Sequence, residues 1–200
     1  MAFLSFLEKS KEIPVCSFGK LPIYQDYINF VPDAAGNAWK TWLLNSFGHD
    51  GIDIPPGVWP FCFRPAGMSE FLVGVIEPSS DGIREFPFSL YVVWPDKKGL
   101  REWAGLHGLW DRLVSLRGEL LAHQSIEEFY QIIGGKTLLM EKGESLSPGI
   151  DSVLESCLGR SNDQAIFLVT PLAHQPPALL AATPAENAVM KAQWQQLAGM

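Results

Sequence analysis

Four charged side chains beside aromatic segments are the strongest candidates for chemistry in this sequence. Lys20 and Asp26 stand in one stretch, and Asp81 and Arg84 stand in another. Two carboxylates and two cations that converge in a fold can form an acid–base site. Such sets more often form a surface ion-pair network of small energetic value. The residue types therefore admit catalysis, and the ion-pair network is the more ordinary interpretation.

The second pair lies within residues 78–88, PSSDGIREFPF. Small polar residues and glycine favour a tight turn, because they tolerate unusual φ values and form local side-chain hydrogen bonds. Asp81 and Arg84, three residues apart, can close this turn with a charge-assisted hydrogen bond. The segment predicts a hairpin turn that fixes strand register. A recognition surface is the alternative interpretation.

Other groups of residues resemble chemical motifs but fail on spacing. Residues 133–137, IGGKT, resemble the end of a phosphate-binding loop, but Tyr130 occupies the place of its first glycine and a helix precedes it. A helix that ends at a glycine is the simpler explanation. The segment 49–53, HDGID, matches neither EF-hand nor zinc spacing. The other histidines are isolated, so we expect no metal site, no cofactor and no catalytic residues.

The apolar pattern places the candidate residues on the strands and loops of an α+β fold. Apolar runs predict strands at residues 13–18, 58–63, 71–76, 86–94 and 165–170. The three middle strands follow one another with turns between them, which is typical of an antiparallel meander. Residues 19–22, GKLP, predict a loop that ends at a proline.

Helical patterns account for much of the remaining chain. Asp33 is the expected N-cap of a helix over about 34–47, and an i, i+3, i+4 stripe predicts a long amphipathic helix from Leu100 to His123. Ser125 and Glu128 form a capping-box pattern that opens a helix to about Ile133.

Two further helices are expected, at 149–158 and 185–197. We predict one α+β domain over residues 1–200, with a largely antiparallel sheet of about five strands and several packed helices. Residues 96–200 are expected to be mostly helical, with one further strand.

Composition narrows the class of partner and the compartment. The net charge of −7 disfavours contact with nucleic acid or an anionic membrane. Cys16, Cys62 and Cys157 are far apart and odd in number, which suits free thiols in a reducing compartment. Residues 2–7 are too short for a signal sequence, and no apolar run reaches the length of about 18 residues that spans a bilayer. We therefore expect a cytoplasmic protein without a membrane span.

The order of these segments resembles a known family. Residues 18–22, FGKLP, followed by Asp26 and the WKTWL of residues 39–43, are similar to the opening of the TagF family, also called ImpM-type proteins, of bacterial type VI secretion. The family pattern continues with an apolar strand, a Ser-x-Asp-x-x-Gly-Arg-like turn and a Phe-Pro, whose counterpart here is the 78–88 segment. The correspondence covers about residues 15–95. Within the turn, Gly82 follows Asp81 directly instead of standing beside the arginine.

The resemblance implies a cytosolic accessory protein that represses type VI secretion after translation. Members of the family are thought to act by binding a forkhead-associated scaffold protein of the apparatus. A binding module without enzymatic activity fits both this family and the absence of catalytic motifs. The expected partner-binding surface combines the two segments. Its residues are Gly19, Lys20, Pro22, Asp26, Ser80, Asp81, Arg84, Phe86 and Pro87.

Two other functions remain open on the sequence. One is a hydrolase that acts on a phosphorylated or acyl substrate through Asp26, Asp81 and Lys20. The other is a structural subunit of the secretion apparatus. If the chain is a binding module, replacing Asp81 or Arg84 by alanine should weaken partner binding and leave the melting temperature nearly unchanged.

Overall fold

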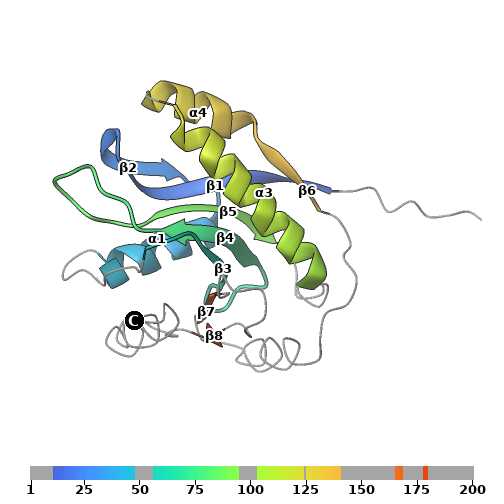
Figure 1. The fold of residues 1–200 in the computed structure, drawn as a ribbon. Helices are drawn as coiled ribbons and strands as arrows, with labels where there is room; N and C mark the ends of the chain where they lie inside the picture. The colour runs from blue at the N-terminus through green and yellow to red at the C-terminus, as the bar shows by residue number, and fades with distance from the viewer. Residues whose placement is uncertain are drawn as a thin grey trace, which may run out of the picture.

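The computed structural model describes residues 11–47, 56–94, 103–123, 125–140, 165–168 and 178–179. Within these ranges an eight-stranded sheet carries helices on both faces (Figure 1). The strands are β1 (Lys11–Leu21), β2 (Tyr24–Phe30), β3 (Trp59–Arg64), β4 (Phe71–Glu77), β5 (Phe88–Trp94), β6 (Thr137–Met140), β7 (Ala165–Leu168) and β8 (Ala178–Leu179). The helices are α1 (Ala34–Phe47), α3 (Trp103–Leu121) and α4 (Ile126–Gly135).

The strands follow the order β2-β1-β5-β4-β3-β7-β8, and every pairing among the described strands is antiparallel. The predicted β3-β4-β5 meander is present, and the predicted α+β fold with an antiparallel sheet is confirmed. The long strand β1 pairs with β5 along one edge. Along its other edge it pairs first with β6 and then with β2. β6 and β2 are two of the three strands that the described part of the chain has beyond the five expected.

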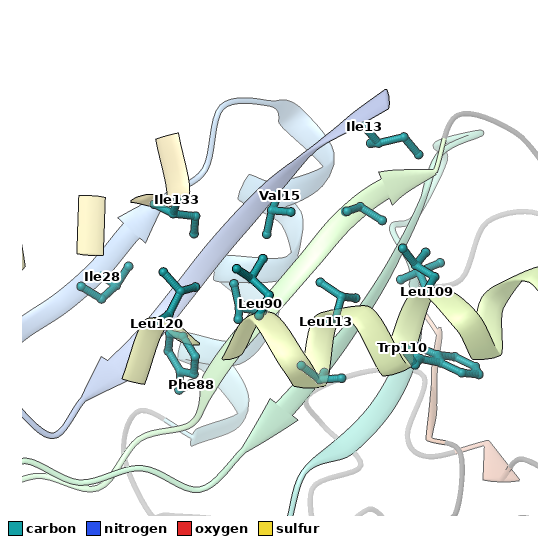
Figure 2. Close-up of a cluster of buried hydrophobic side chains, with 14 of the residues drawn as sticks. Ile13, Val15, Ile28, Phe88, Leu90, Leu109, Trp110, Leu113, Leu120 and Ile133 are labelled. Carbon is teal, nitrogen blue, oxygen red and sulfur yellow. The ribbon is translucent and has the colours of Figure 1, made fainter. Parts of the chain in front are cut away.

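Two hydrophobic layers lie on opposite faces of the sheet. On one face, side chains of α3 and α4 such as Leu113 and Ile133 meet Val15 and Leu90 of the sheet (Figure 2). On the other face, α1 contributes Trp39, whose ring stacks on Phe61 with 4.4 Å between centroids. Because strand side chains alternate, neighbouring residues of one strand serve different layers.

The helix ends follow local sequence signals. Asp33 caps α1, because its Oδ1 accepts a hydrogen bond from the Gly36 N–H at 2.7 Å. Ser125 caps α4, since its Oγ accepts from the Glu128 N–H at 3.1 Å. The N–H of Lys136 then donates to the Ile133 carbonyl at 3.1 Å, at the end of α4. The predicted N-caps Asp33 and Ser125 are confirmed, and α4 ends at Gly135 with Lys136 as its C-cap, directly before β6.

Two segments that were not predicted as strands are strands in the structure. Residues 19–21 were expected in a loop, but β1 continues through Leu21 and the turn comes only at residues 22–23. The strand can continue because Gly19 has no side chain: a Cβ there would lie 2.0 Å from the Pro87 carbonyl oxygen of the neighbouring strand connection. Residues 24–30, which were not assigned as a strand, form β2 beside it.

Several predictions fall partly or wholly outside the described residues. The expected strand at 165–170 is confirmed for residues 165–168. The expected long helix is confirmed from Trp103 to Leu121. The helices expected at 149–158 and 185–197, the 49–53 segment and Cys157 lie outside the described residues.

Candidate functional site

The two segments singled out in the sequence meet at one end of β1. The β4–β5 loop (residues 78–87) projects beyond the strands at the same end of the sheet as the β1–β2 turn (Figure 1). Gly19 pairs with Phe88 of β5 on one side and with Ile28 of β2 on the other. Its φ of +135° is one that residues with a side chain rarely adopt. The N–H of Lys20 donates to the Pro87 carbonyl at 3.2 Å, which fastens the loop to β1.

An ion pair between Lys20 and Asp81 forms the centre of this junction. The Lys20 Nζ lies 2.5 Å from the Asp81 Oδ2, and the two side chains are only 1% and 5% exposed. The same ammonium donates to the main-chain carbonyl of Gln25. A buried ammonium needs such partners, because an unpaired charge in the protein interior is strongly unfavourable. The structure thus joins one charged residue from each predicted segment.

The other carboxylate oxygen of Asp81 organises the loop itself. Its Oδ1 accepts hydrogen bonds from the backbone N–H of Ile83 at 2.9 Å and of Arg84 at 2.7 Å. The hydrogen bond from Lys20, followed by those from the Arg84 and Ile83 N–H groups, holds the pKa of Asp81 well below its usual range. The carboxylate is therefore ionised at neutral pH, with two backbone N–H groups bonded to Oδ1 and the Lys20 ammonium in ion-pair contact with Oδ2.

Further hydrogen bonds fix the rest of the loop. The Gly82 N–H donates to the Ser80 Oγ at 3.0 Å, and the Asp81 N–H donates to the Arg84 carbonyl at 3.3 Å. Below this turn, the Phe86 N–H donates to the Ser79 carbonyl at 3.0 Å. The predicted hairpin turn is therefore present, and it is held by its own side chains as well as by its backbone.

The predicted pairing of Arg84 with Asp81 differs from the observed one. The backbone N–H of Arg84 bonds the carboxylate, while its guanidinium Nη2 donates to the Gln25 carbonyl. Lys20 and two backbone N–H groups already occupy both oxygens of Asp81. Gln25 was missed by sequence reasoning because it contributes a main-chain carbonyl, which any residue type provides.

The predicted surface residues divide into buried supports and exposed groups. Gly19, Lys20, Phe86 and Pro87 are buried. The ring of Phe86 packs edge-on against Tyr27 with 4.7 Å between centroids. These residues hold the loop from beneath and are not accessible to a partner.

The remaining predicted residues are at least partly accessible. Ser80 is half-buried, and Pro22, Asp26 and Arg84 are exposed. Within the described ranges, the Asp26 side chain forms no hydrogen bond or ion pair, and so none with Lys20.

Two exposed apolar side chains at this junction were not predicted. Ile83, at the tip of the β4–β5 loop, is 81% exposed, and Ile23, in the β1–β2 turn, is 47% exposed. The bond from Arg84 to Gln25 brings these two connections together. We call Ile83 and Arg84 the tip. Ile83 was missed because isoleucine is usually buried, and neither of its neighbours, Gly82 and Arg84, indicates that its side chain is exposed.

The thiol of Cys16 is not activated. Burial, and secondly the charge of Asp33, raise the pKa of Cys16 to about 12, so the thiol stays protonated at neutral pH. Among the described residues, no group of three or more His, Cys, Asp or Glu is placed to hold a metal ion. No helix in the described part of the chain has the length and apolar character needed to cross a membrane.

Comparison with known proteins found a solved structure with a similar fold and no match by sequence. No protein-family model and no curated protein matches the sequence. The structure is similar to the crystal structure of PA0076 from Pseudomonas aeruginosa PAO1, with a TM-score of 0.56 and 18% sequence identity. The similarity covers 93% of this chain and 94% of that chain. This chain and PA0076 therefore have similar folds.

Proposed function

We propose that this chain is a cytoplasmic regulator of a bacterial type VI secretion system that represses the apparatus by binding one of its proteins. The expected partner is a forkhead-associated scaffold protein, as the resemblance to the TagF family implies. The observation that carries the proposal is the buried Lys20–Asp81 pair. It ties together the two segments on which that resemblance rests.

The division into buried supports and an exposed tip favours binding. The tip is held by Asp81, Ser80 and the Lys20 ammonium, so little conformational entropy remains to be lost when a partner binds. Arginine and large apolar side chains at the centre of an interface often dominate its affinity. The Arg84 guanidinium uses one nitrogen for Gln25, and it has further donors for a partner's carboxylate.

The geometry gives less support to a hydrolase. A general base needs an accessible oxygen and a pKa near the working pH. Asp81 has a lowered pKa, with two backbone N–H groups bonded to Oδ1 and the Lys20 ammonium beside Oδ2, and the Asp26 side chain forms no ion pair within the described ranges. Hydrolysis of phosphatase or esterase substrates by the wild type, lost in Asp81→Asn, would favour the enzyme. Stable co-purification with assembled particles would favour the structural subunit.

The proposal is tested by calorimetric titration of the purified scaffold with wild type, Ile83→Ala and Arg84→Ala. Val114 on α3 is an apolar control, because it is 40% exposed and lies away from the loop. Lys136 is a charged control, because it pairs with Glu119 at 2.8 Å on another part of the surface. Weaker binding by the tip variants alone supports the proposal, and equal affinities for all five proteins contradict it.

A further inference from the structure

A pocket with apolar walls lies toward the other end of β1. Its volume is about 230 Å³, and its apolar lining includes Pro14, Pro32 and Val93. Pro14 and Pro32 are exposed, and the buried Cys16 also contributes to the lining. We call this the β1 pocket. It is open to solvent at the prolines and has space for a branched apolar side chain.

The β1 pocket is also acidic. Glu12 and Asp33 both line it, and none of the described residues that line it is cationic. Glu12 accepts a hydrogen bond from the Thr137 hydroxyl at 3.1 Å, and Asp33 accepts from the Gly36 N–H at 2.7 Å. Neither carboxylate forms an ion pair within the described ranges. An apolar group that carries a cation at its side would complement this pocket.

The tip of the β4–β5 loop combines an exposed apolar side chain with a neighbouring cation. Ile83 is 81% exposed, and the exposed Arg84 follows it directly. We propose that the tip of one copy of this chain inserts into the β1 pocket of a second copy. Ile83 then fills the apolar part, and the Arg84 guanidinium reaches Glu12 or Asp33.

The tip lies beside the Lys20 end of β1 and the β1 pocket lies at the Glu12 end, and this separation decides the arrangement of the two copies. Glu12 and Lys20 are eight residues apart on an extended strand, which corresponds to roughly 26 Å. A chain therefore does not fill its own pocket. Two copies that run antiparallel to each other form both contacts at once, which gives a closed two-fold dimer. The dimer covers the tip, so it competes with any other protein that binds there.

This inference does not depend on the identity of the secretion partner, and it is tested on the full chain alone. Sedimentation velocity over a range of concentrations should show a monomer–dimer equilibrium for the wild type. Ile83→Ala should weaken the dimer about tenfold or more, because each contact loses most of its buried apolar surface. Val114→Ala, a matched loss of an exposed apolar side chain, should leave the equilibrium unchanged.

Charge exchange tests the pairing of tip and pocket. Arg84→Glu and Glu12→Arg should each be monomeric, because both contacts then bring like charges together. An equimolar mixture of the two variants should dimerise. In such a pair one contact joins the exchanged charges, and the other joins the natural ones. Circular dichroism checks that both variants are folded, and Arg84→Ala replaces Arg84→Glu if the reversal prevents folding.

Three results would overturn the inference: a wild type that stays monomeric at every soluble concentration, a dimer that Ile83→Ala does not weaken, or a mixture that stays monomeric. A monomeric wild type whose tip variants still lose scaffold binding leaves the proposed function in place. If the wild type dimerises through the tip but the tip variants keep their affinity for the scaffold, the dimer stands and the proposed function fails.

Discussion

Lys20 is the residue whose environment most constrains the candidate site. Its side chain is only 1% exposed, and its ammonium is held by the Asp81 carboxylate and the Gln25 carbonyl. Removing one partner of a buried ion pair costs more than the intact pair contributes, because the other charge remains in the interior. The same residue that suggested an acid–base group is thus a structural support for the tip.

Asp81→Ala and Arg84→Ala, both expected from the sequence to leave the melting temperature nearly unchanged, should differ in stability. Asp81→Ala should lower the melting temperature by several degrees, because it leaves the Lys20 ammonium without its counter-charge and removes the acceptor for two backbone N–H groups. Arg84→Ala should leave it nearly unchanged, since that side chain is exposed. Thermal unfolding followed by circular dichroism measures both. Equal melting temperatures for the wild type and Asp81→Ala would show that the pair does not stabilise the fold.

Acid should weaken the same interaction. The pKa of Asp81 is lower in the folded chain than its ordinary value of 3.8, so the ionised carboxylate contributes stability above that pH. This contribution is lost as the pH falls below about 3.8 toward the folded value. Melting temperatures measured from neutral pH into this acidic range should fall more steeply for the wild type than for Asp81→Asn. Parallel curves would mean that the carboxylate is not held as described.

At the scale of the elements, β1 positions both the β4–β5 loop and the β1 pocket, on which the two proposals rest. Its C-terminal end carries Lys20 beneath the β4–β5 loop, and its N-terminal end carries Glu12 at the β1 pocket. Gly19 lets β1 pass between β5 and β2 without a clash. The loop therefore depends on a glycine in the strand as well as on its own turn residues.

Gly19→Ala should destabilise the fold strongly. The new Cβ would meet the Pro87 carbonyl oxygen at 2.0 Å, at a φ of +135°, and we expect a loss of about 3 kcal/mol in the free energy of unfolding. Gly67→Ala is a matched control with a φ of +70° and no atom within 4 Å of the added carbon, for which about 1 kcal/mol is expected. Urea unfolding measures both losses. Similar losses for the two variants would remove the argument for close packing at Gly19.

The elements that could be predicted are those with local signals. Apolar and aromatic residues marked β3, β4 and β5, and Asp33 and Ser125 marked the starts of two helices. The strand character of residues 19–21 and of β2 depends on pairing between distant segments, which a short sequence window does not contain.

The candidate site was predicted in part for the same reason. The residue types identified Lys20, Asp81 and Arg84 as candidates, but they did not show which of these residues pair. Lysine is usually exposed, so its type gave no sign that Lys20 would be buried. Gln25 acts through its backbone, and Ile83 is distinguished only by its exposure.

At the scale of the whole molecule, the sheet and its two helical layers form a scaffold with a fixed tip at one end. The mainly aromatic layer under α1 and the mainly aliphatic layer under α3 account for most of the buried side chains described. The β4–β5 loop projects beyond this scaffold (Figure 1), and the backbone of the tip is held in place by Asp81. Such an arrangement suits a protein that acts by contact, with its stability and its recognition carried by different residues.

The affinity of the forkhead-associated scaffold for Arg84→Ala, relative to the wild type and to Lys136→Ala, tests the central claim most directly. We expect the dissociation constant of Arg84→Ala to rise at least about tenfold with an unchanged melting temperature, because in the proposed complex the exposed guanidinium contacts the partner and not the core. Lys136→Ala should bind as the wild type does. An Arg84→Ala variant that binds the scaffold with wild-type affinity would contradict the account.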